Sequence, residues 1–148
     1  MNRSFGDEFN LSRFLAAQES VYDSVLRELA AGEKTGHWIW FIFPQLRGLG
    51  RSSTAAFFGI ASAAEASAYW RHPVLGARLS ECCSTVLRIQ GKTALEVFGS
   101  PDDLKLRSSM TLFERAAPDA PVFALVLERY FDGGRDGRTL EPLGRPKA

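Results

Sequence analysis

The sequence predicts an all-α fold, a single compact domain of about six to eight helices. Apolar residues recur at helical spacing along most of the chain, and Ser, Thr or Pro repeatedly stands where a helix would begin. Segments with strand character are too few to pair into a sheet. A length of 148 residues, with 45% hydrophobic and 24% charged residues, is typical of one globular domain.

We expect this domain to cover residues 10–131. Residues 1–9 lack hydrophobic periodicity and are predicted to form a flexible N-terminus, whereas residues 132–148 mix Gly, Pro and Arg as C-terminal tails do. Between them we find no repeat at the periods of solenoid proteins and no long linker. The chain therefore offers no boundary for a second domain.

The clearest helix is predicted over residues 11–31. Asn10 is a candidate N-cap, and Gly32 is placed to end the helix. The apolar residues that follow helical spacing are Leu11, Phe14, Leu15, Tyr22, Val25, Leu26 and Leu29.

The run from Trp38 to Phe43 has the aromatic and β-branched composition of a buried strand. However, no other segment is a convincing partner, and an unpaired strand would leave its backbone N–H and C=O groups unsatisfied in the core. We therefore predict a short helix or turn here.

The remaining helices are predicted from their first residues. Ser62 with Glu65, and Thr93 with Glu96, have the spacing of a capping box, in which the two side chains bond backbone N–H groups of the first turn. A short helix is expected over 54–58. Longer helices are expected from Pro73 to about Ile89, from Pro101 to Ala117, and from Pro121 to just before Gly133, this last one closing the domain.

Charge and cysteine content exclude several classes of protein. A formal net charge of +1 gives no general field for binding nucleic acid or an acidic membrane. The N-terminus has no signal-peptide core and the longest apolar run is too short to span a bilayer, so we expect a cytoplasmic protein without membrane contact. The only cysteines, Cys82 and Cys83, are adjacent and predict free thiols. Homodimerisation stays open.

Three segments, GHWIWFIFPQLRGLGRS, AYWRHPVLGARL and FGSPDDLKLRSSMTLF, closely resemble those of a bacterial family. This is the domain-of-unknown-function family eighteen-ten, whose members are small, all-helical and sometimes labelled calpastatin. The resemblance runs from about Leu11 to Leu140 and implies a helical fold. It implies no established activity, and these residues give no physical argument for the protease inhibitor that the label suggests.

The first candidate site is the loop of residues 48–53, which leads into the predicted helix 54–58. Gly48 and Gly50 permit close backbone approach, and Arg51 and Ser52 stand where free N–H groups gather at a helix start. Such a loop suits a phosphate or a carboxylate. It lacks the Gly-Lys-Ser or Gly-Lys-Thr of a Walker loop, and an ordinary turn explains the glycines equally simply.

The second candidate is the segment 34–45. Trp38 and Trp40 offer flat faces on which a base could stack, and Lys34 and Gln45 offer polar groups. His37 lies outside the apolar run and could carry a proton or simply cap a backbone carbonyl. The alternative for the tryptophans is core packing, by which small domains gain much of their stability.

The third candidate is the predicted helix 101–117. A partly buried Lys105 could activate a hydroxyl such as that of Ser109 or bind an anion. The spacing is not that of a catalytic Ser-x-x-Lys motif, and an ion pair between Asp102 and Lys105 with capping serines is the simpler reading. The polar residues of this helix are Asp102, Asp103, Lys105, Arg107, Ser108, Ser109 and Thr111.

Together these segments predict a pocket for an anionic, ring-bearing metabolite such as a nucleotide or an ADP-ribose-like compound. His37, Lys105 and Ser109 are the candidate catalytic groups, and we predict neither a metal nor a cofactor. The alternatives are a non-catalytic module that binds a protein through an aromatic groove, and aromatic residues that all belong to the core. The candidate ligand-binding residues are Lys34, His37, Trp38, Trp40, Gln45, Arg51, Ser52, Lys105, Arg107, Ser108 and Ser109.

Overall fold

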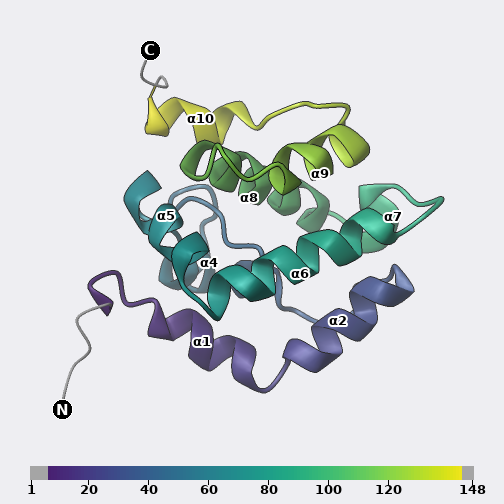
Figure 1. Ribbon diagram of the computed structural model, residues 1–148, viewed down its shortest axis with the longest axis horizontal. Helices are drawn as coiled ribbons and strands as arrows, with labels where there is room; N and C mark the ends of the chain where they lie inside the picture. Colours follow the sequence, from purple (N-terminus) through teal and green to yellow (C-terminus); the bar gives the residue numbers. More distant parts are fainter. Residues whose placement is uncertain (1–6, 145–148) are drawn as a thin grey trace.

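The computed structural model describes residues 7–144 and is all-helical over that range, with one isolated bridge between Leu46 and Ile60 (Figure 1). The described residues form ten helices, more than the six to eight predicted. Residues 1–6 of the predicted flexible N-terminus and 145–148 of the predicted tail lie outside the described residues. The helices are α1 Ser12–Glu19, α2 Tyr22–Ala31, α3 Ile39–Ile42, α4 Ser53–Phe58, α5 Ala63–Arg71, α6 Leu75–Arg88, α7 Ala94–Phe98, α8 Asp102–Ala116, α9 Val122–Phe131 and α10 Gly137–Leu143.

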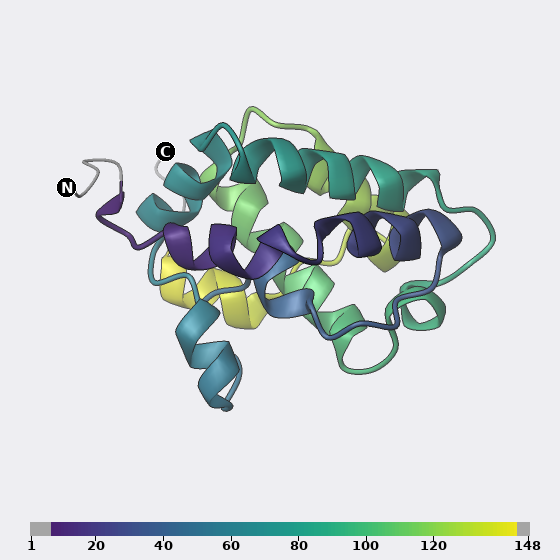
Figure 2. The ribbon, with the colours of Figure 1, turned by 90° about the horizontal axis from the view of Figure 1, so that it is seen from below.

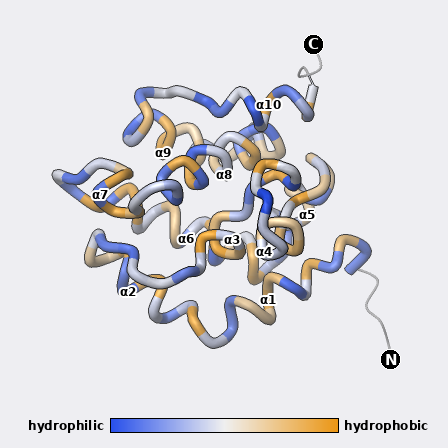
Figure 3. Tube along the Cα trace, turned by 180° about the vertical axis from the view of Figure 1, so that it is seen from behind, coloured by the Kyte–Doolittle hydropathy of each residue, from blue (hydrophilic) through white to orange (hydrophobic). Residues whose placement is uncertain are grey.

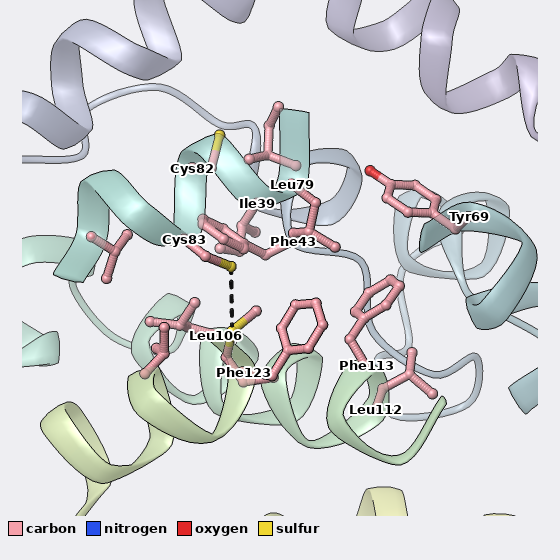
Figure 4. Packing of buried hydrophobic residues seen from close by; sticks show 14 of the residues in the cluster. Ile39, Phe43, Tyr69, Leu79, Cys82, Cys83, Leu106, Leu112, Phe113 and Phe123 are labelled. Atoms are coloured by element: carbon pink, nitrogen blue, oxygen red, sulfur yellow. Dashed lines mark hydrogen bonds between the residues drawn. The ribbon is translucent and has the colours of Figure 1, made fainter. Parts of the chain in front are cut away.

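Helix α8 is the central element, because α3, α5, α7, α9 and α10 all pack against it. In the core, Leu79 and Cys83 of α6 face Leu106 of α8 and Phe123 of α9 (Figure 4). Hydrophobic and hydrophilic residues alternate along each longer helix, as expected for helices with one buried face (Figure 3). Both cysteines are buried free thiols, and burial raises the pKa of Cys82 to about 12.

The predicted helix 11–31 is two helices. Helix α1 ends at Glu19, and α2 begins at Tyr22 after Val21 leaves the helical conformation with φ −121°. The chain changes direction at this break, and α1 packs on α3 while α2 packs on α6 (Figure 1). Asn10 is not the N-cap, since Leu11 holds that position without a side-chain bond. Gly32 ends α2 with a left-handed φ of 72°, as predicted.

The aromatic run forms the predicted short helix, α3, with Trp38 and Phe43 as its flanking residues. The N–H groups of Ile42 and Phe43 donate to the carbonyls of Trp38 and Ile39, so the backbone is satisfied without a partner strand. The helical turn also buries Ile39 and Ile42 together. Backbone satisfaction therefore prevails over strand propensity in this segment.

The predicted capping box is complete at the start of α7 but only half formed at the start of α5. Thr93 and Glu96 form a complete capping box at α7. Ser62 accepts a bond from the N–H of Glu65 as expected, but the Glu65 side chain instead accepts from Ala61 N and from Arg13. The expected start of α8 after Pro101 and of α9 after Pro121 is observed.

The predicted tail contains a further helix, α10, which packs on α8. Together with the break between α1 and α2, it accounts for the two helices beyond the predicted maximum. None of the helices in residues 7–144 is long and apolar enough to cross a membrane.

Candidate functional site

A pocket of about 230 Å³ lies where the segment after α3, the start of α8 and helix α10 meet. Figure 2 shows α10 running beside the segment that connects α3 to α4. Two of the lining residues are cationic and none is acidic. We call this hollow the anion pocket, and it is lined by Gln45, Leu49, Gly50, Pro101, Leu104, Lys105, Ser108 and Arg138.

Lys105 is held at the pocket wall by two contacts. Its ammonium lies 3.3 Å from Asp102 Oδ1 and 4.7 Å from the centre of the Trp40 ring. Lys34 takes the other oxygen of Asp102 at 2.6 Å. The Lys34 side chain is only 5% exposed, whereas that of Lys105 is 22% exposed. One carboxylate thus serves two ammonium groups, and the accessible one faces the pocket with an excess of positive charge.

Arg138 supplies the second cation from α10. One of its Nη atoms donates to the Leu49 carbonyl at 3.1 Å, and the residue is otherwise exposed. This bond ties α10 to the loop on the far side of the pocket. A guanidinium has five N–H donors, so others remain for a ligand.

Asp136 fastens α10 to α8. Its carboxylate accepts bonds from Ser108 Oγ at 2.8 Å and from Thr139 Oγ1 at 2.5 Å, and its N–H donates to Thr111 Oγ1. Burial acts to raise the pKa of Asp136, but the hydrogen bonds from Thr139 and Ser108 outweigh it and hold the pKa below its usual value. Arg107 binds the same segment by donating to the carbonyls of Gly134 and Arg135.

Two buried side-chain polar atoms in the described part of the chain have no hydrogen-bond partner. They are Oε1 of Gln45, which lines the pocket, and Oγ of Ser109, which is fully buried within α8. Buried polar atoms are normally paired, so each is unusual. Only the Gln45 amide belongs to a side chain that a molecule in the anion pocket would touch.

The structure brings together only part of the predicted set. Gln45, Lys105 and Ser108 line the anion pocket, with Trp40 and Lys34 one contact behind Lys105. The remaining predicted residues do not line it. Three of them are bonded within the chain: Trp38 is 3% exposed and donates to Glu28 at 2.9 Å, Ser52 caps α4, and Arg107 donates to backbone carbonyls. Ser109 is fully buried, whereas His37 and Arg51 are exposed.

Sequence reasoning missed Arg138, since it lies in the segment predicted to be a tail. The signal that could have found it is the sequence from Asp136 to Leu143, where an acid followed three residues later by Thr139 is compatible with a helix start. No group of three or more His, Cys, Asp or Glu residues in positions 7–144 is arranged to hold a metal ion.

A second, larger hollow of about 490 Å³ lies between the N-terminal segment and α4. Phe57, which is 55% exposed, forms one side of it, and α4 extends away from the other helices in Figure 2. The cation at its base, Arg13, is already bonded to four carbonyls and to Glu65. The lining residues are Phe9, Asn10, Arg13, Arg47, Ser53, Ala56 and Phe57.

Comparisons with known proteins place the chain among relatives of unknown function. Residues 8–143 match the family described as "Protein of unknown function (DUF1810)". The crystal structure of the conserved hypothetical protein Rv1873 from Mycobacterium tuberculosis is similar, with a TM-score of 0.91 and 54% sequence identity over 93% of this chain and 98% of that chain. No curated protein matches.

Proposed function

We propose, for a chain that belongs to the DUF1810 family of proteins of unknown function, that it binds a small anionic metabolite in the anion pocket. The observation that carries the proposal is the pair of cations from separate elements, Lys105 of α8 and Arg138 of α10, in a pocket whose lining residues include no acid. Segments distant in sequence meet there, as is usual for binding sites in globular domains.

The state of each cation supports this proposal. Lys105 has only a 3.3 Å contact with Asp102, which is already paired more closely with Lys34. A cation–π contact with the Trp40 ring positions the ammonium and leaves its charge unneutralised. Arg138 uses one donor on the Leu49 carbonyl. An oxyanion between the two cations would complete the pairing that the chain leaves incomplete.

The volume limits which part of a metabolite enters. At about 230 Å³ the pocket is smaller than the roughly 300–1,000 Å³ of sites that enclose whole drug-sized ligands. A nucleotide or an ADP-ribose-like compound would therefore place its phosphate inside. Its ring would rest over the apolar rim of Leu49 and Leu104, because Trp38 is buried in the core.

The proposal is tested by titrating the protein with inorganic phosphate, ribose phosphate and AMP in a calorimeter and in thermal unfolding. A ligand at 100 times its Kd should add about 2.7 kcal/mol to the free energy of unfolding. We expect Lys105→Ala and Arg138→Ala each to weaken binding about tenfold, the loss of one charged hydrogen bond. Arg51→Ala removes an exposed arginine outside the pocket and is the matched control. Equal binding by Arg138→Ala and wild type would contradict the proposed site.

A second candidate function is favoured by Phe57. Its exposed ring lines the same hollow as Phe9, and an exposed aromatic hollow is of the kind that binds another protein or a second copy of the chain. Sedimentation over a range of concentrations tests self-association, and Phe57→Asn should abolish it. A wild-type protein that stays monomeric throughout would remove the self-association form of this candidate.

A further inference from the structure

We infer that the ligand of the anion pocket carries a neutral hydrogen-bond donor next to its oxyanion, which identifies its class as phosphorylated polyols or hydroxy acids. The inference rests on the proposed function and adds which chemical group must accompany the anion. It follows from two residues that line the same pocket as the two cations: Ser108, whose hydroxyl oxygen can only accept, and Gln45, whose buried amide oxygen has no partner.

Ser108 can only accept from a ligand. Its hydroxyl oxygen lies 2.8 Å from Asp136 Oδ2 and 3.1 Å from the Leu104 carbonyl oxygen. Both neighbours are acceptors, and a serine hydroxyl has a single proton to donate. Whichever neighbour receives that proton, the oxygen presents only its lone pairs to the pocket. A ligand atom that bonds to Ser108 must therefore bring its own proton.

Gln45 presents a second acceptor without a partner. Its Oε1 is buried and unbonded, although a buried amide oxygen ordinarily has a hydrogen bond. The terminal torsion of a glutamine is soft, so the amide can turn toward the pocket at small cost. A ligand donor there would satisfy an atom that the chain itself leaves unsatisfied.

The positions of these groups determine the arrangement within the ligand. Ser108 follows Lys105 by three residues on α8, so their side chains are neighbours on one helix face, with Cβ atoms about 5–6 Å apart. The oxyanion and the donor must then lie within a few bonds of each other in the ligand. An ammonium donor would meet the charges of Lys105 and Arg138, whereas a hydroxyl carries no charge and fits.

Two pairs of probes that differ by hydroxyl groups test the inference: glycerol phosphate against propyl phosphate, and glycolate against acetate. Each is titrated calorimetrically into the full chain. We expect the hydroxylated member of at least one pair to bind about tenfold tighter, the contribution of roughly one hydrogen bond. The preferred pair distinguishes a phosphate ester from a carboxylate as the natural anion.

Two variants separate the roles of the anion and the donor. Gln45→Leu, with a side chain of similar size, should reduce the preference for the hydroxylated probes, because the amide oxygen that accepts from the hydroxyl is lost. Lys105→Ala should weaken both members of a pair by the same factor and so leave the preference intact. A Gln45→Leu protein that fails to fold leaves the decision to the wild-type preference.

The outcomes distinguish the two proposals. Tighter binding of the hydroxylated member, reduced in Gln45→Leu, supports the inference. Equal binding within both pairs overturns the inference and leaves the anion site standing. Failure of all four probes to bind overturns the anion site together with the inference.

Discussion

Two clusters of polar side chains in this domain differ in how completely they are bonded. Arg13 is only 8% exposed, yet its guanidinium donates to the carbonyls of Phe9, Asn10, Phe57 and Gly59 and to the Glu65 carboxylate at 2.7 Å. The anion pocket contains the same kinds of group. There, the Lys105 ammonium lies 3.3 Å from Asp102, a carboxylate that also pairs with Lys34. The Gln45 amide oxygen has no partner.

The difference separates a polar cluster that stabilises the fold from the cluster at which we propose that a ligand binds. The Arg13 cluster joins the N-terminal segment, the end of α4 and the start of α5, and its buried hydrogen-bonding capacity is used within the chain. Such a cluster fixes the fold and offers nothing to a ligand. A cluster that keeps acceptors and positive charge unpaired beside a hollow is destabilising in isolation, which makes a ligand the natural complement.

The largest expected effect comes from breaking the complete cluster. Arg13→Ala should lower the free energy of unfolding by about 3–5 kcal/mol, because it leaves the Glu65 charge buried and unpaired. Urea unfolding measures this loss. Arg51→Ala, in an exposed position, should change stability by about 0.5 kcal/mol or less.

A double variant sharpens the same test. If the cost lies in the uncompensated charge, Arg13→Met combined with Glu65→Leu should be more stable than Arg13→Met alone, since a buried ion pair can be replaced by apolar side chains at little net cost. A loss below about 1 kcal/mol for Arg13→Ala would show that this cluster contributes little to the stability of the fold.

A matched pair of glutamines gives the second prediction. Gln18 is fully used: its Nε2 donates to the Phe41 carbonyl at 2.7 Å and to Tyr69 Oη, and its Oε1 accepts from Arg78. Gln18→Leu should therefore cost about 1–3 kcal/mol. Gln45→Leu removes an unpaired buried oxygen and should leave stability unchanged or raise it by about 1 kcal/mol. Thermal and urea unfolding of both variants measures the change in the free energy of unfolding. A similar loss of stability in both would contradict the distinction between a fully bonded and an unpaired glutamine.

Much of the fold could be predicted from local signals. Periodicity, Pro101 and Pro121 at helix starts, and the Thr93 capping box depend on residues within one or two turns of each other, so one sequence carries them. The break at Val21 could not be predicted in this way, since it lets α1 and α2 pack on different partners. Helix α10 was missed because its Gly and Pro content resembles a tail, while its attachment to α8 is tertiary.

The site was less predictable for the same reason. Arg51, Arg107 and Arg138 are the same residue type in similarly polar surroundings, and only tertiary contacts decide that Arg107 binds carbonyls while Arg138 lines the pocket. The pairing of Arg13 with Glu65 spans 52 residues and leaves no local mark. Aromatic composition left two alternatives at Trp38, a ligand surface or core packing, and the buried indole, whose N–H donates to Glu28, corresponds to core packing. Polar residues on an otherwise central helix were the informative signal, and they located Lys105 and Ser108.

The smallest expected effect concerns Asp136, which holds α10, and with it Arg138, at the pocket. Its pKa in the folded chain lies below the usual 3.8, so its stabilising contribution is complete above about pH 4 and is lost as the pH falls through the lower, folded value. At neutral pH Asp136→Asn should lower the free energy of unfolding by about 1 kcal/mol, discounted for partial exposure.

Urea unfolding of Asp136→Asn and wild type at neutral pH and at about pH 3 tests this, because the difference between the two proteins should shrink in acid while other carboxylates cancel. Asp119→Asn, in the exposed turn between α8 and α9, is the control and should show little difference at either pH. A difference of equal size at both pH values would mean that the charge of Asp136 does not hold α10. In that case Arg138 would owe its place at the pocket to other contacts of this segment, such as those from Arg107 and the bond from Arg138 to the Leu49 carbonyl.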